Sequence, residues 1–328
     1  MARKRRYIKP EALHEVVSRT EGTLPLPPTE LTNELLRGIY ARSQRDDEID
    51  LCNFVHMNNH THEQIVPRSA QALCNFYKET KKRTTEAVKR LLGKERLTLW
   101  EPRSNVEYIP RLPDAVTRVV YLFCNPASAG LVDSIEQYPA LNTWDAFKNC
   151  EPSVESAVLI PARCYYQSAI PQLSETNSLT EVEDQITTSM LKELKKGYAH
   201  NLIIRPFAWL KPFGITDPAQ IEAIRQEIIA RVLAREEELR QTREHPVIGA
   251  ERLKRQEYFR PHEPKERGRK TFVYCSDSSV RAEVIAKSES LDEECRRLYK
   301  LVLAGEEVTW PPGVFIPWVR PTGIPAIP

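Results

Sequence analysis

The chain has 328 residues, a hydrophobic fraction of 41% and a formal net charge of +2, which suits one large domain or two ordinary ones. No apolar run reaches the length of a membrane span, and Met1 to Arg6 lacks the apolar segment of a signal peptide. The seven scattered cysteines form no Cys-x-x-Cys pair, which indicates reduced thiols. We therefore expect a cytoplasmic protein without membrane contact. The small net charge does not exclude nucleic acid, because binding depends on where charge lies.

The N-terminal part alternates strand and helix patterns. Apolar residues recur at helical spacing in two segments, and the intervening stretches have the short apolar runs of strands. In chain order we expect a strand over 12–20, a helix over 29–45, strands over 50–57 and 60–66, a helix over 69–92, strands over 97–99 and 106–109, and a helix opened by Pro113. This order predicts an α+β fold: a ferredoxin-like (RRM-like) antiparallel sheet with helices on one face.

The character of the sequence changes near Cys150. The expected elements beyond it are strands over 157–160, 164–168 and 201–210, helices over 181–196, 218–243 and 278–303, and an exposed polar stretch over 251–270. Residues 311–328 are rich in proline and cannot form regular structure. We therefore expect one domain at 1–149 and a mixed α/β C-terminal extension at 150–328.

His60 and His62 are the most informative residues. They follow the turn-like pair Asn58-Asn59, at the start of an expected strand. Side chains alternate along a strand, so both imidazoles would face one way, about 7 Å apart along the backbone. Two imidazoles on one rigid face can hold a divalent metal ion and leave positions open for a phosphate oxygen. A chance cluster with His56 is an equally good explanation on this evidence alone.

Tyr121 is the candidate nucleophile, because a tyrosine can attack a phosphodiester and form a covalent phosphotyrosine link. Asn125 lies four residues later, on the same face of the expected helix, where its side-chain oxygen can serve as a third metal ligand. By spacing alone, the commoner fates of these residues are a core aromatic for Tyr121 and a cap before Pro126 for Asn125.

Three segments, in order, resemble a known family. The segment from Phe54 to His62 is similar to the HUH motif of single-tyrosine transposases, in which two histidines flank a bulky residue. The segment from Tyr121 to Val132, with its Asn-Pro and Gly-Leu-Val, resembles the family's tyrosine helix. Residues 12–19 and 97–101 resemble its first strand and the strand before that helix. The match spans roughly residues 7–147 and is closest to the REP-associated tyrosine transposases, within the insertion-sequence-200-like group.

The resemblance implies a metal-dependent single-stranded DNA endonuclease and strand transferase that works through a 5′-phosphotyrosine intermediate. It assigns His60, His62 and Asn125 as ligands of Mg²⁺ or Mn²⁺ and Tyr121 as the nucleophile. It also implies single-stranded or hairpin DNA as the partner and makes a homodimer plausible. The domain at 1–149 is then the catalytic domain, and the role of 150–328 is left open between DNA clamping, dimerisation and recruitment of a host factor. DNA-backbone contacts are expected from the basic residues of the second long helix: Lys81, Lys82, Arg83 and Lys89.

Two alternatives remain open on the sequence. One is a domesticated, non-catalytic nucleic-acid-binding regulator on the same fold. The other makes the histidine cluster incidental and predicts no metal binding. If Tyr121 is not the nucleophile, Tyr165 and Tyr166 are the next candidates.

Overall fold

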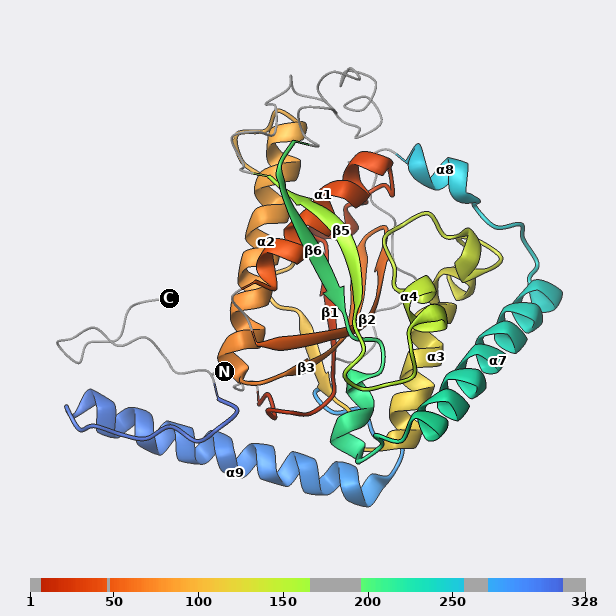
Figure 1. The fold of residues 1–328 in the computed structure, drawn as a ribbon. Helices are drawn as coiled ribbons and strands as arrows, with labels where there is room; N and C mark the ends of the chain where they lie inside the picture. Colours follow the sequence, from red (N-terminus) through yellow and green to blue (C-terminus); the bar gives the residue numbers. More distant parts are fainter. Residues whose placement is uncertain (1–6, 46–47, 166–195, 257–270, 315–328) are drawn as a thin grey trace.

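The structure is a computed structural model that describes residues 7–45, 48–165, 196–256 and 271–314. Its centre is a four-stranded antiparallel sheet in the order β2-β3-β1-β4 (Figure 1). The strands are β1 (His14–Arg19), β2 (Ile49–Met57), β3 (His60–Pro67) and β4 (Asn105–Tyr108). With one helix after β1 and another after β3, this is the ferredoxin-like arrangement, and it confirms the predicted fold class.

The helices α1 (Glu30–Ser43) and α2 (Ala70–Leu91) cover one face of the sheet. Each begins where a side-chain oxygen, from Thr29 or Ser69, accepts a backbone N–H of the first turn. Their apolar stripes bury against alternate residues of the central strands, because a strand presents every second side chain to a given face. This core contains Val16, Leu36, Tyr40, Phe54, Ile65, Leu73 and Phe76.

The opposite face is covered by α3 (Leu112–Ser128). Pro113 stands in its first turn, as predicted. The helix continues through Pro126, so Asn125 lies inside it and is not a cap. The expected single helical face therefore describes α1 and α2, while α3 forms a second layer whose core contains Leu13, Val55, Val66, Val119, Leu122 and Phe123.

Elements beyond residue 150 add to both layers. The antiparallel pair of β5 (Val158–Cys164) and β6 (Tyr198–Ile204) packs on α1, and α7 (Pro218–Thr242) packs along α3 (Figure 1). α9 (Ser278–Leu303) extends from the body (Figure 1). Two short helices, α4 (Trp144–Asn149) and α8 (Ala250–Lys254), are the remaining α-helices among the described residues. Because later elements supply both cores, the division at residue 150 stays a prediction.

Several predicted boundaries change. No strand forms at 97–99; Trp100 pairs with Thr20 in an isolated bridge instead. β6 ends at Ile204, and a 3-10 helix, Ala208–Phe213, follows, because Pro206 has no N–H to continue the ladder. β5 is one strand ending at Cys164, where two were expected. The predicted helix at 181–196 lies almost wholly outside the described residues, as do most of 251–270 and of the proline-rich tail.

Alternation along β3 determines which side chains meet α3. His60 lies opposite Arg19 and Met57, and His62 lies opposite Val17 and Val55. These side chains point to the α3 layer, whereas Thr61 and Glu63 point to α1 and α2. Within the described ranges, no helix combines the length and the apolar character that crossing a membrane requires.

Candidate active site between the central strands and α3

His60 and His62 lie together at the start of β3, with ring centroids 5.0 Å apart. The Nδ1 atom of His62 is 2.9 Å from a carboxylate oxygen of Glu15, and that of His60 is 2.7 Å from the side-chain oxygen of Asn59. Each contact favours the tautomer with hydrogen on Nδ1, which leaves the Nε2 lone pair free. Burial, together with the neighbouring His62 and Arg19, holds the pKa of His60 well below its usual range. His60 is therefore neutral near pH 7, as a metal ligand must be.

Glu15 and Arg118 form a buried ion pair beneath the histidines. Glu15 is fully buried on β1, and Arg118 of α3 donates to both of its carboxylate oxygens at 2.5 Å. Burial by itself raises the pKa of Glu15, but its hydrogen bond with His62 and the charge of Arg118 bring that pKa below its ordinary value. Glu15 is therefore an ionised carboxylate that orients His62 and fixes Arg118.

Tyr121 lies one turn after Arg118 on α3 and is 43% exposed. Its ring centroid is 5.7 Å from that of His62, and the Arg118 guanidinium carbon lies 4.7 Å from the Tyr121 ring centroid. Partial burial raises the pKa of the Tyr121 phenol, and the charge of Arg118 acts in the opposite direction. The phenol is thus accessible, protonated near neutral pH, and in contact with one of the two predicted metal ligands.

Asn125 lies one turn beyond Tyr121 and is buried. Its side-chain nitrogen is enclosed and has no hydrogen-bond partner. An amide in this state has unsatisfied polar capacity close to the tyrosine. No contact among the described residues joins Asn125 to either histidine, so its assignment as third ligand stays a prediction.

The donor set fits a divalent ion with open coordination positions. Two imidazoles offer their Nε2 atoms, and Glu15 supports one of them in the manner of a carboxylate–histidine–metal arrangement. Over the described part of the chain, no group of three or more His, Cys, Asp or Glu side chains is arranged to hold a metal.

His56 belongs to the other layer. It is buried among Tyr40 and Phe54, with ring centroids 5.0 and 5.5 Å away, and points away from His60 and His62. Its Nε2 has no partner, and burial lowers its pKa to about 3. It is a neutral core residue, in line with its exclusion from the predicted ligand set.

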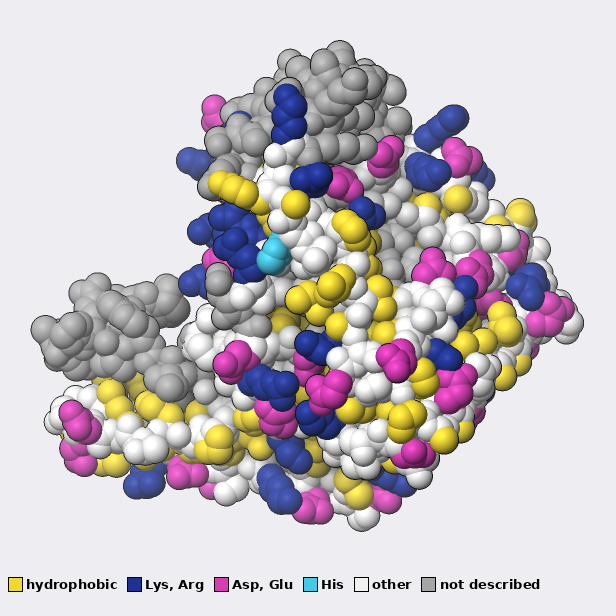
Figure 2. Space-filling view, viewed as in Figure 1, with side chains coloured by type: hydrophobic (Ala, Val, Ile, Leu, Met, Phe, Trp, Pro, Cys, Tyr) yellow, Lys and Arg dark blue, Asp and Glu magenta, His cyan; other side chains and the backbone are white. Residues whose placement is uncertain are grey.

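The basic residues expected to contact DNA lie on α2, on the sheet face away from Tyr121. Three of them have partners: Arg83 pairs with Glu79 at 3.0 Å, Lys89 pairs with Glu86 at 2.6 Å, and Lys81 donates to the Glu101 carbonyl at 3.3 Å. Lys82 is exposed. Figure 2 shows Lys and Arg side chains gathered over this part of the molecule. Their role in DNA binding stays a prediction.

Sequence reasoning did not find Glu15, Arg118 or Tyr274, all of which lie in the site. Glu15 did have a signal in the sequence: it is a charged residue within the apolar run of a strand. A carboxylate buried there requires a partner. Arg118, three residues before Tyr121, is on the tyrosine's helical face. Tyr274 had no signal, since it is 153 positions from Tyr121 in the sequence and only the fold brings it to Arg118, 4.6 Å from its ring centroid.

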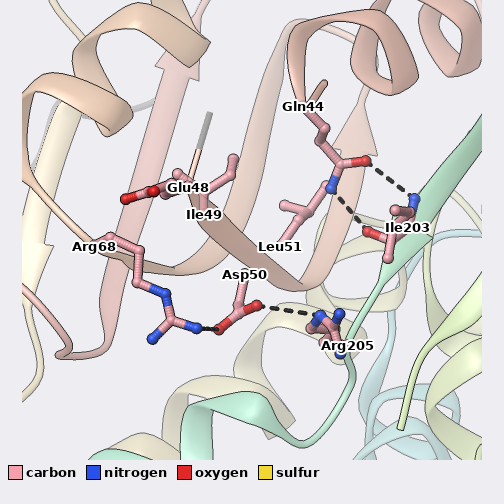
Figure 3. Close-up of a pocket in the computed structure, with 8 residues that line it drawn as sticks. All are labelled: Gln44, Glu48, Ile49, Asp50, Leu51, Arg68, Ile203 and Arg205. Atoms are coloured by element: carbon pink, nitrogen blue, oxygen red, sulfur yellow. Dashed lines mark hydrogen bonds and ion pairs between the residues drawn. The ribbon is translucent and has the colours of Figure 1, made fainter. Parts of the chain in front are cut away.

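A second feature is a pocket of about 440 Å³ at the β2 edge of the sheet (Figure 3). Asp50 lies between Arg205, at 3.2 Å, and Arg68, at 3.5 Å. The side chain of Gln44 makes two hydrogen bonds to the backbone of Ile203, which attaches α1 to β6. These polar groups satisfy one another and include no candidate nucleophile. We therefore interpret the lining of this pocket as a structural junction and not as a catalytic site.

No protein-family model and no curated protein matches the sequence. Among solved structures, the fold is similar to that of a REP-associated tyrosine transposase bound to a REP hairpin. The match has 20% sequence identity and a TM-score of 0.39, and it covers 44% of this chain and 84% of that one. At these values the likeness does not establish the family of the chain.

Proposed function

We propose that this protein is a metal-dependent single-stranded DNA endonuclease and strand transferase of the single-tyrosine HUH type. The observation that carries the proposal is the meeting of Tyr121 with His62 and His60. Tyr121 follows the two histidines by some sixty positions, yet all three residues lie in one partly open site. The ring centroids of Tyr121 and His62 are 5.7 Å apart, and those of His62 and His60 are 5.0 Å apart. The three residues are the ones that the sequence resemblance assigns to catalysis.

In the proposed reaction, the phenolic oxygen of Tyr121 attacks the phosphorus of a DNA phosphodiester. The new bond joins tyrosine oxygen to phosphorus, the bond from phosphorus to the 3′ oxygen breaks, and a 3′-hydroxyl end is released. The phenolic proton is lost to water, and the leaving oxygen takes one from water. Reversal by another 3′-hydroxyl end regenerates Tyr121 and joins two strands.

His60 and His62 would hold the metal through Nε2, with Asn125 as the proposed third ligand. A bound Mg²⁺ or Mn²⁺ supplies charge that polarises the phosphate and stabilises the transition state. The protein's own contribution is rigidity: Glu15 fixes the orientation of His62, and Arg118 lies between that carboxylate and the Tyr121 ring. We place single-stranded or hairpin DNA as the substrate class, on the strength of the motif resemblance.

The proposal is tested by incubating the protein with Mn²⁺ and labelled single-stranded DNA, both a random-sequence library and a set of stem-loops. We expect a labelled protein–DNA adduct that survives denaturing electrophoresis. Tyr121→Phe should abolish the adduct and leave the fold intact, because the side chain is partly exposed. Tyr165→Phe is the matched control, since Tyr165 packs near α1 on the other side of the sheet.

The outcomes separate the candidate functions. An adduct that persists in Tyr121→Phe would show that another residue is the nucleophile. DNA binding without any adduct in the unchanged protein would favour the regulator on the same fold. An absence of Mn²⁺ binding by calorimetry, together with no effect of His60→Ala, would leave the histidines without a metal role.

A further inference from the structure

The segment from Thr271 to Ser276 belongs to the C-terminal part but lies against the active site. Its backbone runs beside β4: Tyr274 donates to the Tyr108 carbonyl and Tyr108 donates to the Phe272 carbonyl, both at 3.0 Å. Val273 forms an isolated parallel bridge with Tyr108 and is buried. These contacts fix the segment on the edge strand of the sheet.

Side chains also attach the segment to groups of the site. The Thr271 hydroxyl donates to Glu107, a carboxylate 3.7 Å from Arg118. At the other end, the backbone N–H of Ser276 lies 3.2 Å from both carboxylate oxygens of Asp114, in the first turn of α3. The segment therefore bridges β4 and the helix that presents Tyr121.

Tyr274 occupies the centre of this segment, and its ring packs on Arg118. The guanidinium carbon is 4.6 Å from the Tyr274 ring centroid and 4.7 Å from that of Tyr121. Arg118 thus contacts two aromatic rings and has the Glu15 carboxylate bound to two of its nitrogens. Contacts of this kind are favourable for a partly desolvated cation and restrict its rotamers.

We propose that Tyr274 is a positioning residue for the Tyr121 nucleophile, acting through Arg118. The inference rests on the proposed function. On this proposal the C-terminal part completes the active site, because without Tyr274 the Arg118 guanidinium loses an aromatic contact and keeps only the one with Tyr121 among the described residues. A looser Arg118 would hold the Tyr121 ring and the Glu15–His62 pair less firmly, and orientation errors of this kind slow a reaction more than they weaken substrate binding.

The kinetic test uses the full chain with Mn²⁺ and a DNA oligonucleotide that forms the adduct. Tyr274→Ala should lower the single-turnover rate of adduct formation about tenfold. DNA affinity should stay within about twofold, since only the rate step depends on the orientation of Tyr121. Tyr274→Phe should keep the rate of the unchanged protein, because the ring is retained and the Tyr274 hydroxyl makes no hydrogen bond to another described residue. Phe272→Ala is the matched control, as Phe272 lies two positions away and is 40% exposed.

A second measurement needs neither DNA nor metal. The Nε–H of Arg118 donates to Glu15, so its NMR signal should exchange slowly with water, and Arg118→Lys identifies it. Tyr274→Ala should speed that exchange about tenfold while Phe272→Ala leaves it unchanged. Unchanged exchange in Tyr274→Ala would overturn the positioning role even if DNA cleavage is confirmed. Faster exchange in a protein that forms no adduct would instead overturn the proposed function alone.

Discussion

Two buried carboxylates on neighbouring strands show how differently the two faces of one sheet are used. Glu15 of β1 faces α3, and Glu63 of β3 faces α1 and α2; both are fully buried. Glu15 binds a guanidinium and a histidine. Glu63 accepts hydrogen bonds from the phenols of Tyr40 and Tyr77.

The partners set opposite protonation tendencies. Burial raises the pKa of both carboxyl groups, but His62 and Arg118 overcome that effect at Glu15, whose pKa is lowered. At Glu63 burial prevails over the two phenols, and the pKa is raised. The α3 face thus keeps charges paired beside an accessible tyrosine, whereas the α1/α2 face holds a polar network inside a closed core. The two faces therefore differ in the partners of their buried carboxyl group: a guanidinium and a histidine on the first face, and two phenols on the second.

The largest expected contrast is in stability. Glu15→Gln removes the carboxylate that Arg118 binds at 2.5 Å and leaves it with the more distant Glu107 carboxylate, 3.7 Å away. The loss should cost about 3–5 kcal/mol of unfolding free energy. Glu63→Gln keeps a group that can hydrogen-bond both phenols and should cost about 1 kcal/mol. Urea unfolding of the two variants at pH 7 measures both values. Equal losses, or a larger loss for Glu63→Gln, would contradict the contrast between the faces.

A second contrast concerns metal affinity. Glu15→Gln weakens the acceptor that orients His62, and loss of such a partner costs about 10–100-fold in affinity. Glu63→Gln alters the other face and should leave Mn²⁺ affinity unchanged. Isothermal titration with Mn²⁺ compares the variants at a temperature where both remain folded. An equal decrease in both would indicate that folding, rather than His62 orientation, determines the change.

Acid should destabilise the protein through its buried neutral histidines. The pKa of His56 is about 3 and that of His14 about 4, both because of burial, against an ordinary value of 6.5. The unfolded chain therefore binds more protons below pH 6.5, so stability present above that pH is lost as the pH falls toward the folded values. Each histidine contributes about 1.4 kcal/mol per pH unit in that window.

His56→Phe tests this effect on the α1/α2 face. The new ring can occupy the space beside Tyr40 and Phe54, and it removes one titrating group. The slope of unfolding free energy against pH, measured between pH 6 and 5, should decrease by about 1.4 kcal/mol per unit. An unchanged slope would show that His56 does not titrate on unfolding in this range.

The smallest expected effect is at Lys82, on the outer side of α2. Because Lys82 is exposed, Lys82→Ala should change stability by less than about 0.5 kcal/mol. If it contacts a DNA phosphate, the slope of log affinity against log salt should become shallower by about one unit. Lys300→Ala on α9 serves as the control. No change in the salt dependence would remove Lys82 from the predicted DNA surface.

Local patterns accounted for most elements of the N-terminal part. Apolar periodicity located α1 and α2, and the pair Asn58-Asn59 located the β2–β3 turn. The patterns failed where strand formation depends on a pairing partner. Residues 97–99 have the pattern of a strand, yet this part of the chain makes only an isolated bridge at Trp100. Short apolar runs do not reveal whether a partner strand is available.

The sequence by itself determined that His60 and His62 share one face, because alternation in a strand is a local property. It also placed Tyr121 and Asn125 on one side of a helix. Only the tertiary structure decided that the two sets meet, since packing of α3 on the sheet is set by burial of residues distant in sequence. For the same reason, Glu15, Arg118 and Tyr274 became neighbours: ion pairs and ring contacts between β1, α3 and a segment beyond residue 270 depend on the folded topology, which local patterns do not contain.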